Sequence, residues 1–348
     1  MEIIKVSSLP LKEVISDIAR EFGVTFQSEC GIFTVDIPQR LGSGTITGSD
    51  FEGGLGLIRY DCMFNTDLTF EHTLDRVHPV KFLFCLEGEI GHNFSNESTW
   101  HQIPRHRNAV VASSSNHGHR VRFRANERTV FTSLELERKS FRTKIKCTPN
   151  SIVKSWSDML NDLAAEKTFY HDGFYSLRVS ELFKEWDHYE DSNFLKYLYL
   201  EGLASKILVV QITQFQDDIR SEGKRTLLRQ AELNQMMRAI NIIDERLEDM
   251  PTIRNIALEV GLSAVKLQQG FKELYGKTAN KYVKEKRLET AKTLLLKTDE
   301  TISNISRLVG IKSVSYFSKV FLDAYGILPS EFQKNRERKK VQPGNLEE

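Results

Sequence analysis

Histidine side chains, which can bind metals and exchange protons near neutral pH, are concentrated in one stretch of the chain. Seven of the nine histidines lie between His72 and His119. Within that stretch, His117-Gly118-His119 would place two imidazoles on one face of a strand, a spacing that suits a metal ion. The arginines at alternate positions from Arg120 to Arg124 would oppose a bound cation, and the next glutamate after His119 is Glu127. The sequence therefore favours ordinary strand residues over a metal site.

The elements that must position these histidines have the pattern of a β domain. From Gly23 to about Phe141, short runs rich in β-branched and aromatic residues are bounded by Gly, Asn, Asp and Pro. Many short strands separated by turns predict a barrel or a sandwich. The clearest runs are Leu55–Tyr60, Val80–Leu86, Ala109–Ser113 and Val130–Leu136. Before them, Leu9–Phe22 has apolar residues at helical spacing, which predicts a short amphipathic helix.

After Pro149 the pattern changes to helices. Leu177–Trp186 and Phe194–Gln216 carry apolar residues at three- and four-residue intervals. The second of them is apolar on more than one side, so it either packs against its own β domain or forms a dimer interface. Asp217–Arg229 is charged and poor in large apolar residues, which is typical of a linker. A further helix is expected from about Gln230 to Glu248.

An internal repeat with a period of about 50 residues occupies the last third of the chain. Residues 252–261 align with residues 301–310, and Phe271 and Gly276 align with Phe321 and Gly326. Each copy predicts a helix, a tight turn and a second helix, because hydroxyl residues suit helix N-caps and glycine suits the turn that ends a helix. The threonine caps, turn glycines and serine caps are Thr252 and Thr301, Gly261 and Gly310, and Ser263 and Ser313. This is a helix-turn-helix pattern.

The second helix of each copy leaves small, polar or basic residues on its outward face. In a helix-turn-helix this helix enters the major groove of DNA. A helix over Thr278–Leu296 would join the copies and span roughly 25–30 Å, close to the roughly 34–36 Å between successive major grooves on one face of DNA. Basic residues in or beside this joining helix are placed to neutralise phosphates; they are Lys281, Lys284, Lys286, Arg287 and Lys292.

The charge of the chain is divided unequally. The net charge of the whole chain is only +1. Residues 251–340 carry 18 basic and 9 acidic residues, and the remainder carries 30 basic and 38 acidic residues. Near-neutrality is therefore a cancellation between a basic C-terminal part, suited to nucleic acid, and an acidic N-terminal part.

Cysteine usage and hydropathy indicate a cytoplasmic protein. Cys30, Cys62, Cys85 and Cys147 are far apart with no Cys-x-x-Cys spacing, so we expect buried thiols rather than a disulfide scaffold. Charged residues interrupt the first 26 residues, which argues against a signal peptide. No apolar run approaches the roughly 18–20 residues of a membrane span, so no membrane partner is expected.

The region from about Gln230 to Phe332 resembles the DNA-binding domain of the AraC/XylS family of bacterial transcriptional regulators. The residues that carry the resemblance are Ile256-Ala257, Gly261-Leu262-Ser263, Leu267, Phe271-Lys272, Gly276, Arg287-Leu288, Ala291, Leu294-Leu295, Ile305, Gly310, Ser315-Tyr316-Phe317-Ser318, Phe321, Gly326, Pro329 and Phe332. Ser306, Ile311 and Gln333 depart from the alanine, phenylalanine and arginine that are usual in the family.

The resemblance implies roles for individual residues. Base edges would be contacted by Val265, Gln268 and Gln269 in the first copy and by Val314, Ser315, Ser318 and Lys319 in the second. Either glutamine could pair with adenine, and Val265 could pack on a thymine methyl group. Phosphate contacts would fall on Lys272, Lys281, Lys284 and Arg287.

The N-terminal part resembles, more loosely, the cupin-type sensor half that often accompanies this DNA-binding domain. The resemblance lies in His101-x-x-Pro104, Asn108, Ala109-Val110-Val111-Ala112 and His117. It implies a barrel whose mouth binds a small effector. The candidate lining residues are Phe82, Phe84, His101, His117, His119 and Arg122.

Together these features predict a multidomain α+β protein. Its N-terminal cupin-like β-barrel carries a helical dimerisation region, and its C-terminal all-α domain holds two helix-turn-helix motifs joined by a long helix. The expected boundaries are 1–148 for the sensor, 149–216 for the dimerisation region, 217–229 for the linker, 230–335 for the DNA-binding domain and 336–348 for a tail.

The predicted function is that of a sequence-specific transcription regulator that responds to an effector, with activation the commoner mode in the family. Expected partners are double-stranded DNA, a second copy of the chain, RNA polymerase and a small-molecule effector, with no cofactor and no metal. The alternative is a metal-dependent cupin enzyme fused to a DNA-binding domain. Stoichiometric iron or zinc that is lost on substituting His117 and His119 would favour that alternative.

Overall fold

The computed structural model describes residues 2–73, 77–145, 154–188, 194–220 and 230–334. The chain divides into two compact units, one up to residue 226 and one from residue 227 onward. In the described residues, no helix is long and apolar enough to cross a membrane.

The first unit is a sandwich of two β-sheets. The smaller sheet has the order β1 (Glu2–Val6), β6 (Leu68–His72), β11 (His119–Phe123), β8 (Glu89–Phe94) and β9 (His101–Pro104). The larger has the order β13 (Phe169–Tyr175), β10 (Arg107–Ala112), β7 (Val80–Glu87), β12 (Thr129–Leu136), β5 (Leu55–Phe64), β4 (Gly42–Phe51), β3 (Ile32–Asp36) and β2 (Gln27–Glu29). Adjacent strands pair antiparallel except β1 and β6. The predicted β domain is confirmed, whereas its likeness to a cupin barrel stays a prediction.

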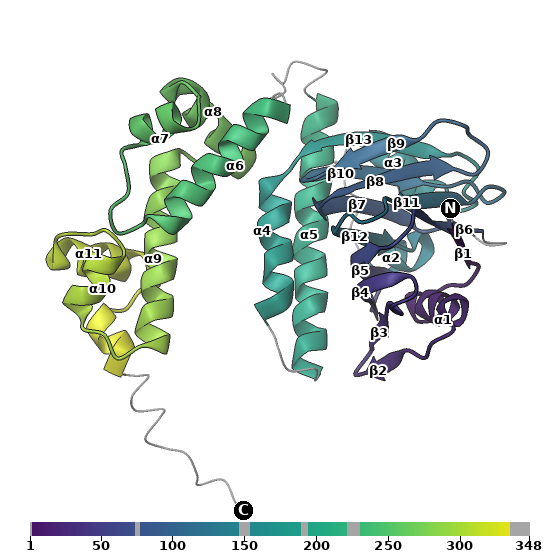
Figure 1. Cartoon of the computed structure of the whole chain (residues 1–348), viewed down its shortest axis with the longest axis horizontal. Helices are drawn as coiled ribbons and strands as arrows, with labels where there is room; N and C mark the ends of the chain where they lie inside the picture. The colour runs from purple at the N-terminus through teal and green to yellow at the C-terminus, as the bar shows by residue number, and fades with distance from the viewer. Residues whose placement is uncertain (1, 74–76, 146–153, 189–193, 221–229, 335–348) are drawn as a thin grey trace, which may run out of the picture. The chain divides into compact units, whose positions relative to one another are not determined.

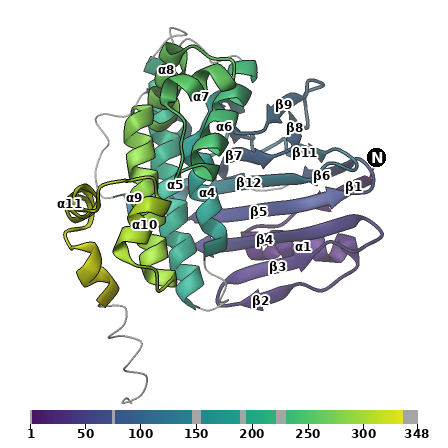
Figure 2. The ribbon, with the colours of Figure 1, turned by 60° about the vertical axis from the view of Figure 1, so that its left-hand side comes forward.

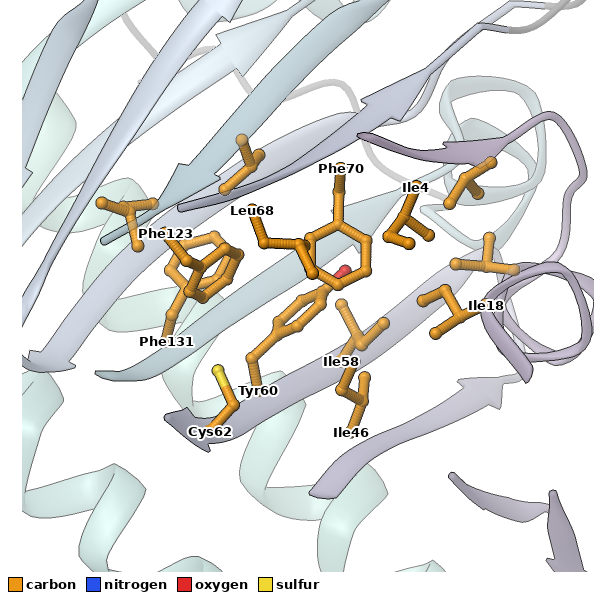
Figure 3. Close-up of a cluster of buried hydrophobic side chains, with 14 of the residues drawn as sticks. Ile4, Ile18, Ile46, Ile58, Tyr60, Cys62, Leu68, Phe70, Phe123 and Phe131 are labelled. Atoms are coloured by element: carbon orange, nitrogen blue, oxygen red, sulfur yellow. The ribbon is translucent and has the colours of Figure 1, made fainter. Parts of the chain in front are cut away.

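Aromatic side chains from both sheets fill one end of the space between them (Figure 3). Tyr60 of the larger sheet lies 5.3 Å from Phe70 and 5.5 Å from Phe123 of the smaller sheet, measured between ring centroids. Phe131 of β12 packs against both Tyr60 and Phe123. Residues of each strand alternate between this interior and the opposite face, so a strand side chain's place in the sequence decides which face it reaches.

Helices cover the other face of the larger sheet (Figures 1 and 2). They are α3 (Lys154–Asn161), α4 (Leu177–Lys184) with the short turn η1 (Glu185–His188), and α5 (Phe194–Arg220). Trp156, Phe183 and Phe215 from these helices share one core with strand residues of that face. The helix α1 (Leu11–Phe22) instead packs into the space between the sheets, and α2 (Arg138–Lys144) follows β12.

Three features of the first unit differ from the expectations. The region 149–216 contains the strand β13, because Phe169–Tyr175 pairs with the edge of β10, a long-range contact that helical periodicity cannot show. The helix α5 continues to Arg220, four residues into the expected linker, and residues 221–229 lie outside the described residues. Cys62 and Cys85 are buried as expected, but Cys30 is exposed in a turn, and Cys147 lies outside the described residues.

The second unit is helical. Its elements are α6 (Gln230–Glu245), α7 (Ile253–Glu259), α8 (Ala264–Tyr275), α9 (Ala279–Lys297), α10 (Ile302–Leu308) and α11 (Val314–Tyr325). Helices α7 and α8 form the first predicted helix-turn-helix, α10 and α11 form the second, and α9 joins them, as expected. The expected tail, 336–348, lies outside the described residues.

Hydroxyl caps set the helix boundaries of both copies. Thr252 and Thr301 accept hydrogen bonds from the backbone N–H of Asn255 and Asn304, at 3.2 and 3.1 Å. The serine caps of α8 and α11 do the same at 3.1 and 3.2 Å. Gly261, between the helices of the first copy, has φ of 77°, where glycine carries no steric penalty. The hydroxyl caps and the turn glycine that the repeat predicted therefore set where its second helices begin.

Candidate functional site

The outward face of α8 carries the base-reading residues predicted for the first copy. Val265 is 67% exposed, and Gln269 and Lys272 are also exposed. Gln268 is different, because its Oε1 accepts a hydrogen bond from the backbone N–H of Ala279 at 3.0 Å. Gln268 thus caps the start of α9, so Gln269 is the glutamine whose amide stays available for a base edge.

The outward face of α11 presents the corresponding residues of the second copy. Val314, Ser315 and Lys319 are exposed, and Ser318 is half-buried. Tyr316, in the first turn of the helix, is 54% exposed on the same face and was not among the candidates predicted from the sequence. Its position beside Ser315 on the outward turn was the available signal. An aromatic ring there offers both an apolar surface and a hydroxyl to a groove.

The lysines of the second unit divide into paired and unpaired groups. Lys277 and Lys286 lie 2.5 Å from Glu285 and 3.2 Å from Asp244. Lys266 of α8 is likewise paired with Glu232. The predicted phosphate-contact lysines have no acidic partner in the described part of the chain; they are Lys272, Lys281 and Lys284, all exposed. Unpaired exposed cations are the ones free to displace counterions from a DNA backbone.

Arg287 is placed differently from those lysines. Its side chain is half-buried, and its Nη2 donates to the carbonyl of Leu247 at 3.3 Å. Burial lowers the pKa of this guanidinium. A Cβ added to Gly310 would lie 2.7 Å from Arg287 Nη2, so the guanidinium also lies against the turn of the second copy. Arg287 therefore ties α9 to the segment after α6 and to that turn, and its phosphate contact stays a prediction.

The geometry of the second unit suits a duplex. Helix α9 has 19 residues, which corresponds to roughly 28 Å at the usual rise. It joins two helices whose exposed faces carry amide, hydroxyl, apolar and ammonium groups, the types that read base edges and phosphates.

The six predicted effector residues do not form one site. Phe82 and Phe84 point from β7 toward the covering helices, with ring centroids 5.5 Å from Trp156 and Phe183 respectively. They belong to that core rather than to the interior of the sandwich. The reason is strand alternation, since their neighbour Leu83 faces the interior.

Of the remaining predicted effector residues, His101 and His119 both lie beside His92, whereas His117 and Arg122 lie elsewhere. The strand β11 begins at His119, so His117 lies in the preceding turn, exposed and hydrogen-bonded to Ser114 Oγ at 3.1 Å. The two imidazoles therefore do not share a strand face. Arg122 is on the outer face of the sheet, 4.4 Å from the centroid of the Trp100 ring. His119 is on the inner face, and His101 is half-buried with its ring stacked on Tyr170 at 3.9 Å.

His119 belongs to a buried histidine cluster, which we define as His72, His78, His92 and His119. The rings of His72 and His119 stack at 4.5 Å, and His92 and His78 lie 5.4 and 6.1 Å from His119. Both ring nitrogens of His78, His92 and His119 are buried without a hydrogen-bond partner in the described part of the chain. Such groups are uncommon inside proteins.

The histidine cluster is held neutral by its surroundings. Burial, reinforced by Lys81, lowers the pKa of His78 to about 4. Burial and the neighbouring His101 lower the pKa of His92 to about 3. The pKa values of His72 and His119 are also well below the usual histidine value, mainly through burial. No group of three or more His, Cys, Asp or Glu side chains among the described residues could hold a metal ion.

Both units match families of regulators. Residues 43–227, more than half of the chain, match the family described as "Regulatory protein PchR N-terminal domain", and residues 256–335 match the one described as "Helix-turn-helix domain". The chain belongs to the AraC/XylS family of transcriptional regulators.

Individual relatives of this AraC/XylS chain match a fraction of the chain and a fraction of their own length. The regulatory protein PocR of Salmonella typhimurium is 32% identical over 101 residues, which is 29% of this chain and 33% of PocR. The arabinose operon regulatory protein of Escherichia coli K12 is 30% identical over 140 residues, 40% of this chain and 48% of that protein. The chain therefore spans about a third to a half of the length of these two relatives.

Solved structures include a transcriptional regulator with an AraC-type DNA-binding domain from Chromobacterium violaceum. It is 29% identical, with 32% of this chain and 96% of that chain covered, at a TM-score of 0.29. The curated relatives of this AraC/XylS chain are named as regulators and activators and not as enzymes. The metal-dependent enzyme alternative is therefore not supported.

Proposed function

We propose that this AraC/XylS chain is a sequence-specific regulator that binds promoter DNA through α8 and α11 in successive major grooves. The observation that carries the proposal is the pair of exposed second helices joined by α9, with unpaired Lys281 and Lys284 on the joining helix. In this arrangement the lysines bind the phosphates between the grooves, and Gln269, Val265 and Tyr316 read bases.

The first unit is proposed to sense a small effector and to hold two copies of the chain together. Helix α5 supports the dimer proposal, because Phe194, Leu198 and Val209 are 60%, 50% and 64% exposed while its other face is part of the core. Large apolar side chains on a solvent face are typical of a surface that another chain covers. A cupin-like sensor, activation rather than repression, and contact with RNA polymerase belong to the same proposal.

Mapping of the bound sites in the genome that encodes the chain tests the DNA proposal. We expect a small set of promoter sites sharing one motif. Gln269→Ala should then lower the affinity for the best of these sites about tenfold, and leave binding to random duplex unchanged, because the lost contact is to a base edge.

Gln268→Ala is the matched control. Because the amide of Gln268 is hydrogen-bonded to the start of α9, this variant should keep the discrimination between cognate and random duplex while its melting temperature falls. Equal loss of discrimination in the two variants, measured by fluorescence anisotropy, would contradict the assignment of Gln269. Absence of any preferred genomic sequence would contradict the proposed function.

A further inference from the structure

A cavity opens beside the β4–β5 turn of the sandwich, and its lining includes Val77 and Pro79, the chain neighbours of His78. Its volume is about 490 Å³, within the usual range for small-molecule sites. Its walls come from the start of α1, the β4–β5 turn, β12 and α2, and most of the lining is apolar, including Leu11, Phe51, Leu55 and Pro79. An organic ligand of moderate size with an apolar body would therefore fit.

The polar side chains of this cavity are three carboxylates and the hydroxyl of Ser140. Glu135 lines it although it is only 6% exposed. Its Oε1 is 2.5 Å from Lys81 Nζ, while its Oε2 has no hydrogen-bond partner among the described residues. Because Glu135 lines the cavity and this oxygen has no donor within the described part of the chain, it can accept a hydrogen bond from a ligand.

Two further carboxylates line the same cavity. Asp50 accepts hydrogen bonds from the backbone N–H groups of Leu11 and Lys12 at 3.0 and 3.1 Å, and Glu137 caps α2. Burial and the nearby Glu135 raise the pKa of Asp50. The charged residues of the lining are these three carboxylates, while the nearby cations Lys81 and Lys139 lie outside the lining, beside Glu135 and Glu137. The lining itself is therefore negatively charged, which favours a positive charge inside the cavity.

We propose that this cavity binds a small organic cation, a primary ammonium group on an apolar body, and that it is the effector site of the regulator. Only the second part of this proposal, the role of the cation as effector, rests on the proposed function. The ammonium donates to Glu135 Oε2 in a charge-assisted hydrogen bond, and the apolar body packs against Phe51 and Leu55. An anionic ligand is disfavoured by the same three carboxylates.

The cavity wall contacts the helix that leads toward the DNA-binding unit. Tyr197, near the start of α5, donates from its hydroxyl to the carbonyl oxygen of Asp50 at 3.0 Å. Its ring also lies 5.4 Å from that of Phe51. Asp50 and Phe51 thus line the cavity and also contact Tyr197 of α5. The last four residues of α5 lie within the expected linker. Ligand binding that shifts this wall would therefore shift α5.

Isothermal titration calorimetry of the full chain with 2-phenylethylammonium, 2-phenylethanol and 3-phenylpropanoate tests the binding step. These probes share an aromatic body and differ in charge. We expect the ammonium to bind about tenfold more tightly than the alcohol, and no binding of the carboxylate. Equal affinity for the ammonium and the alcohol, or no binding of the ammonium at millimolar concentration, overturns the proposal without needing any variant.

Glu135→Gln locates the binding site. Glutamine keeps an acceptor for Lys81 but loses the charge, so the affinity for 2-phenylethylammonium should fall about tenfold. Glu87→Gln is the matched control, because Glu87 is also ion-paired, with Arg128, but lies outside the cavity. Wild-type affinity in E135Q, or an equal loss in E87Q, overturns the assignment.

The regulatory half is tested by adding 2-phenylethylammonium to the full chain bound to its mapped promoter site. We expect the affinity for DNA to change several-fold, and Tyr197→Phe to bind the amine normally but to lose that change. Because calorimetry needs no DNA, amine binding tests the cavity even if the chain binds no promoter. A mapped promoter whose occupancy is unaffected by a bound amine would overturn the effector role and leave the DNA proposal standing.

Discussion

The two units place their unpartnered polar groups in opposite environments. In the DNA-binding unit, Lys281 and Lys284 have no acidic partner in the described part of the chain, and both are on the surface. In the sandwich, the ring nitrogens of His78, His92 and His119 lack partners in the interior. The lysines can be reached by a ligand at the surface, whereas the histidines lie inside a folded core.

The two groups differ in their solvation, and this decides what an unpartnered group costs. An exposed ammonium is solvated, so leaving it unpaired costs little until DNA arrives and releases its counterions. A buried imidazole without a partner lowers the free energy of unfolding, and it stays neutral only because charging it inside the core is less favourable still. DNA binding by the surface lysines should therefore depend on salt, and the stability of the sandwich should depend on pH.

Acid should have the largest effect, and it should act on the sandwich. In the unfolded chain histidine titrates near pH 6.5, but His78 and His92 in the fold titrate near 4 and 3. The unfolded state therefore binds more protons below pH 6.5, so the free energy of unfolding falls as the pH drops from 6.5 toward 4. Each histidine contributes at most about 1.4 kcal/mol per pH unit and less close to pH 6.5, which gives about 3 kcal/mol for these two between pH 6.5 and 5.

Urea unfolding followed by tryptophan fluorescence measures this loss selectively, because Trp100, Trp156 and Trp186 all lie in the first unit. His92→Leu should remove the share of the loss that comes from His92, about 1.5 kcal/mol, whatever it does to stability at pH 7. His117→Ala, an exposed histidine, should leave the loss unchanged. The same pH dependence of the free energy of unfolding in wild type and H92L would show that the burial of His92 does not cause the loss.

Salt should have the next largest effect, and it should act on DNA binding. Replacing Lys281 and Lys284 by alanine should weaken binding to every duplex by about tenfold or more at low salt. The slope of log affinity against log salt should also become less steep by about two, one for each lost phosphate contact. Fluorescence anisotropy between 50 and 200 mM salt would measure both quantities.

The double variant Lys277→Ala and Lys286→Ala is the control for charge alone. It removes the same number of lysines, but these are paired with Glu285 and Asp244. We expect the slope to change by less than one. Equal slopes in the two double variants would mean that ion pairing within the chain does not decide which lysines meet phosphate.

The DNA-binding unit was predictable because its signals are local. A threonine or serine cap and a turn glycine specify a helix boundary through contacts three or four residues away, and Thr252, Ser263 and Gly261 act as expected. What the sequence could not show was which outward side chains are already used. Gln268 caps α9 through a contact 11 residues away, and nothing in the repeat distinguishes it from Gln269.

The sandwich was predictable only as a class of fold. Its strands were visible, but the face that each side chain reaches depends on where the strand begins and on what covers it. His117 fell outside β11 by two residues, and Phe82 turned toward helices rather than the interior. The cavity that contains Glu135 joins four segments distant in sequence, so no spacing rule could have assembled it.

The smallest effect is expected at Arg287. This residue is cationic like the exposed lysines but half-buried, so it lies between the exposed and the buried polar groups. If it ties α9 to Leu247, as its hydrogen bond indicates, Arg287→Gln should lower the free energy of unfolding of the second unit by about 1 kcal/mol and leave the salt slope unchanged. Calorimetric melting would show the loss, while tryptophan fluorescence, which follows only the first unit, would not move. A phosphate contact predicts the reverse, a slope less steep by about one and a normal melt. Arg287→Lys separates the two roles further, because lysine keeps the charge for phosphate but cannot span the same positions with a planar guanidinium.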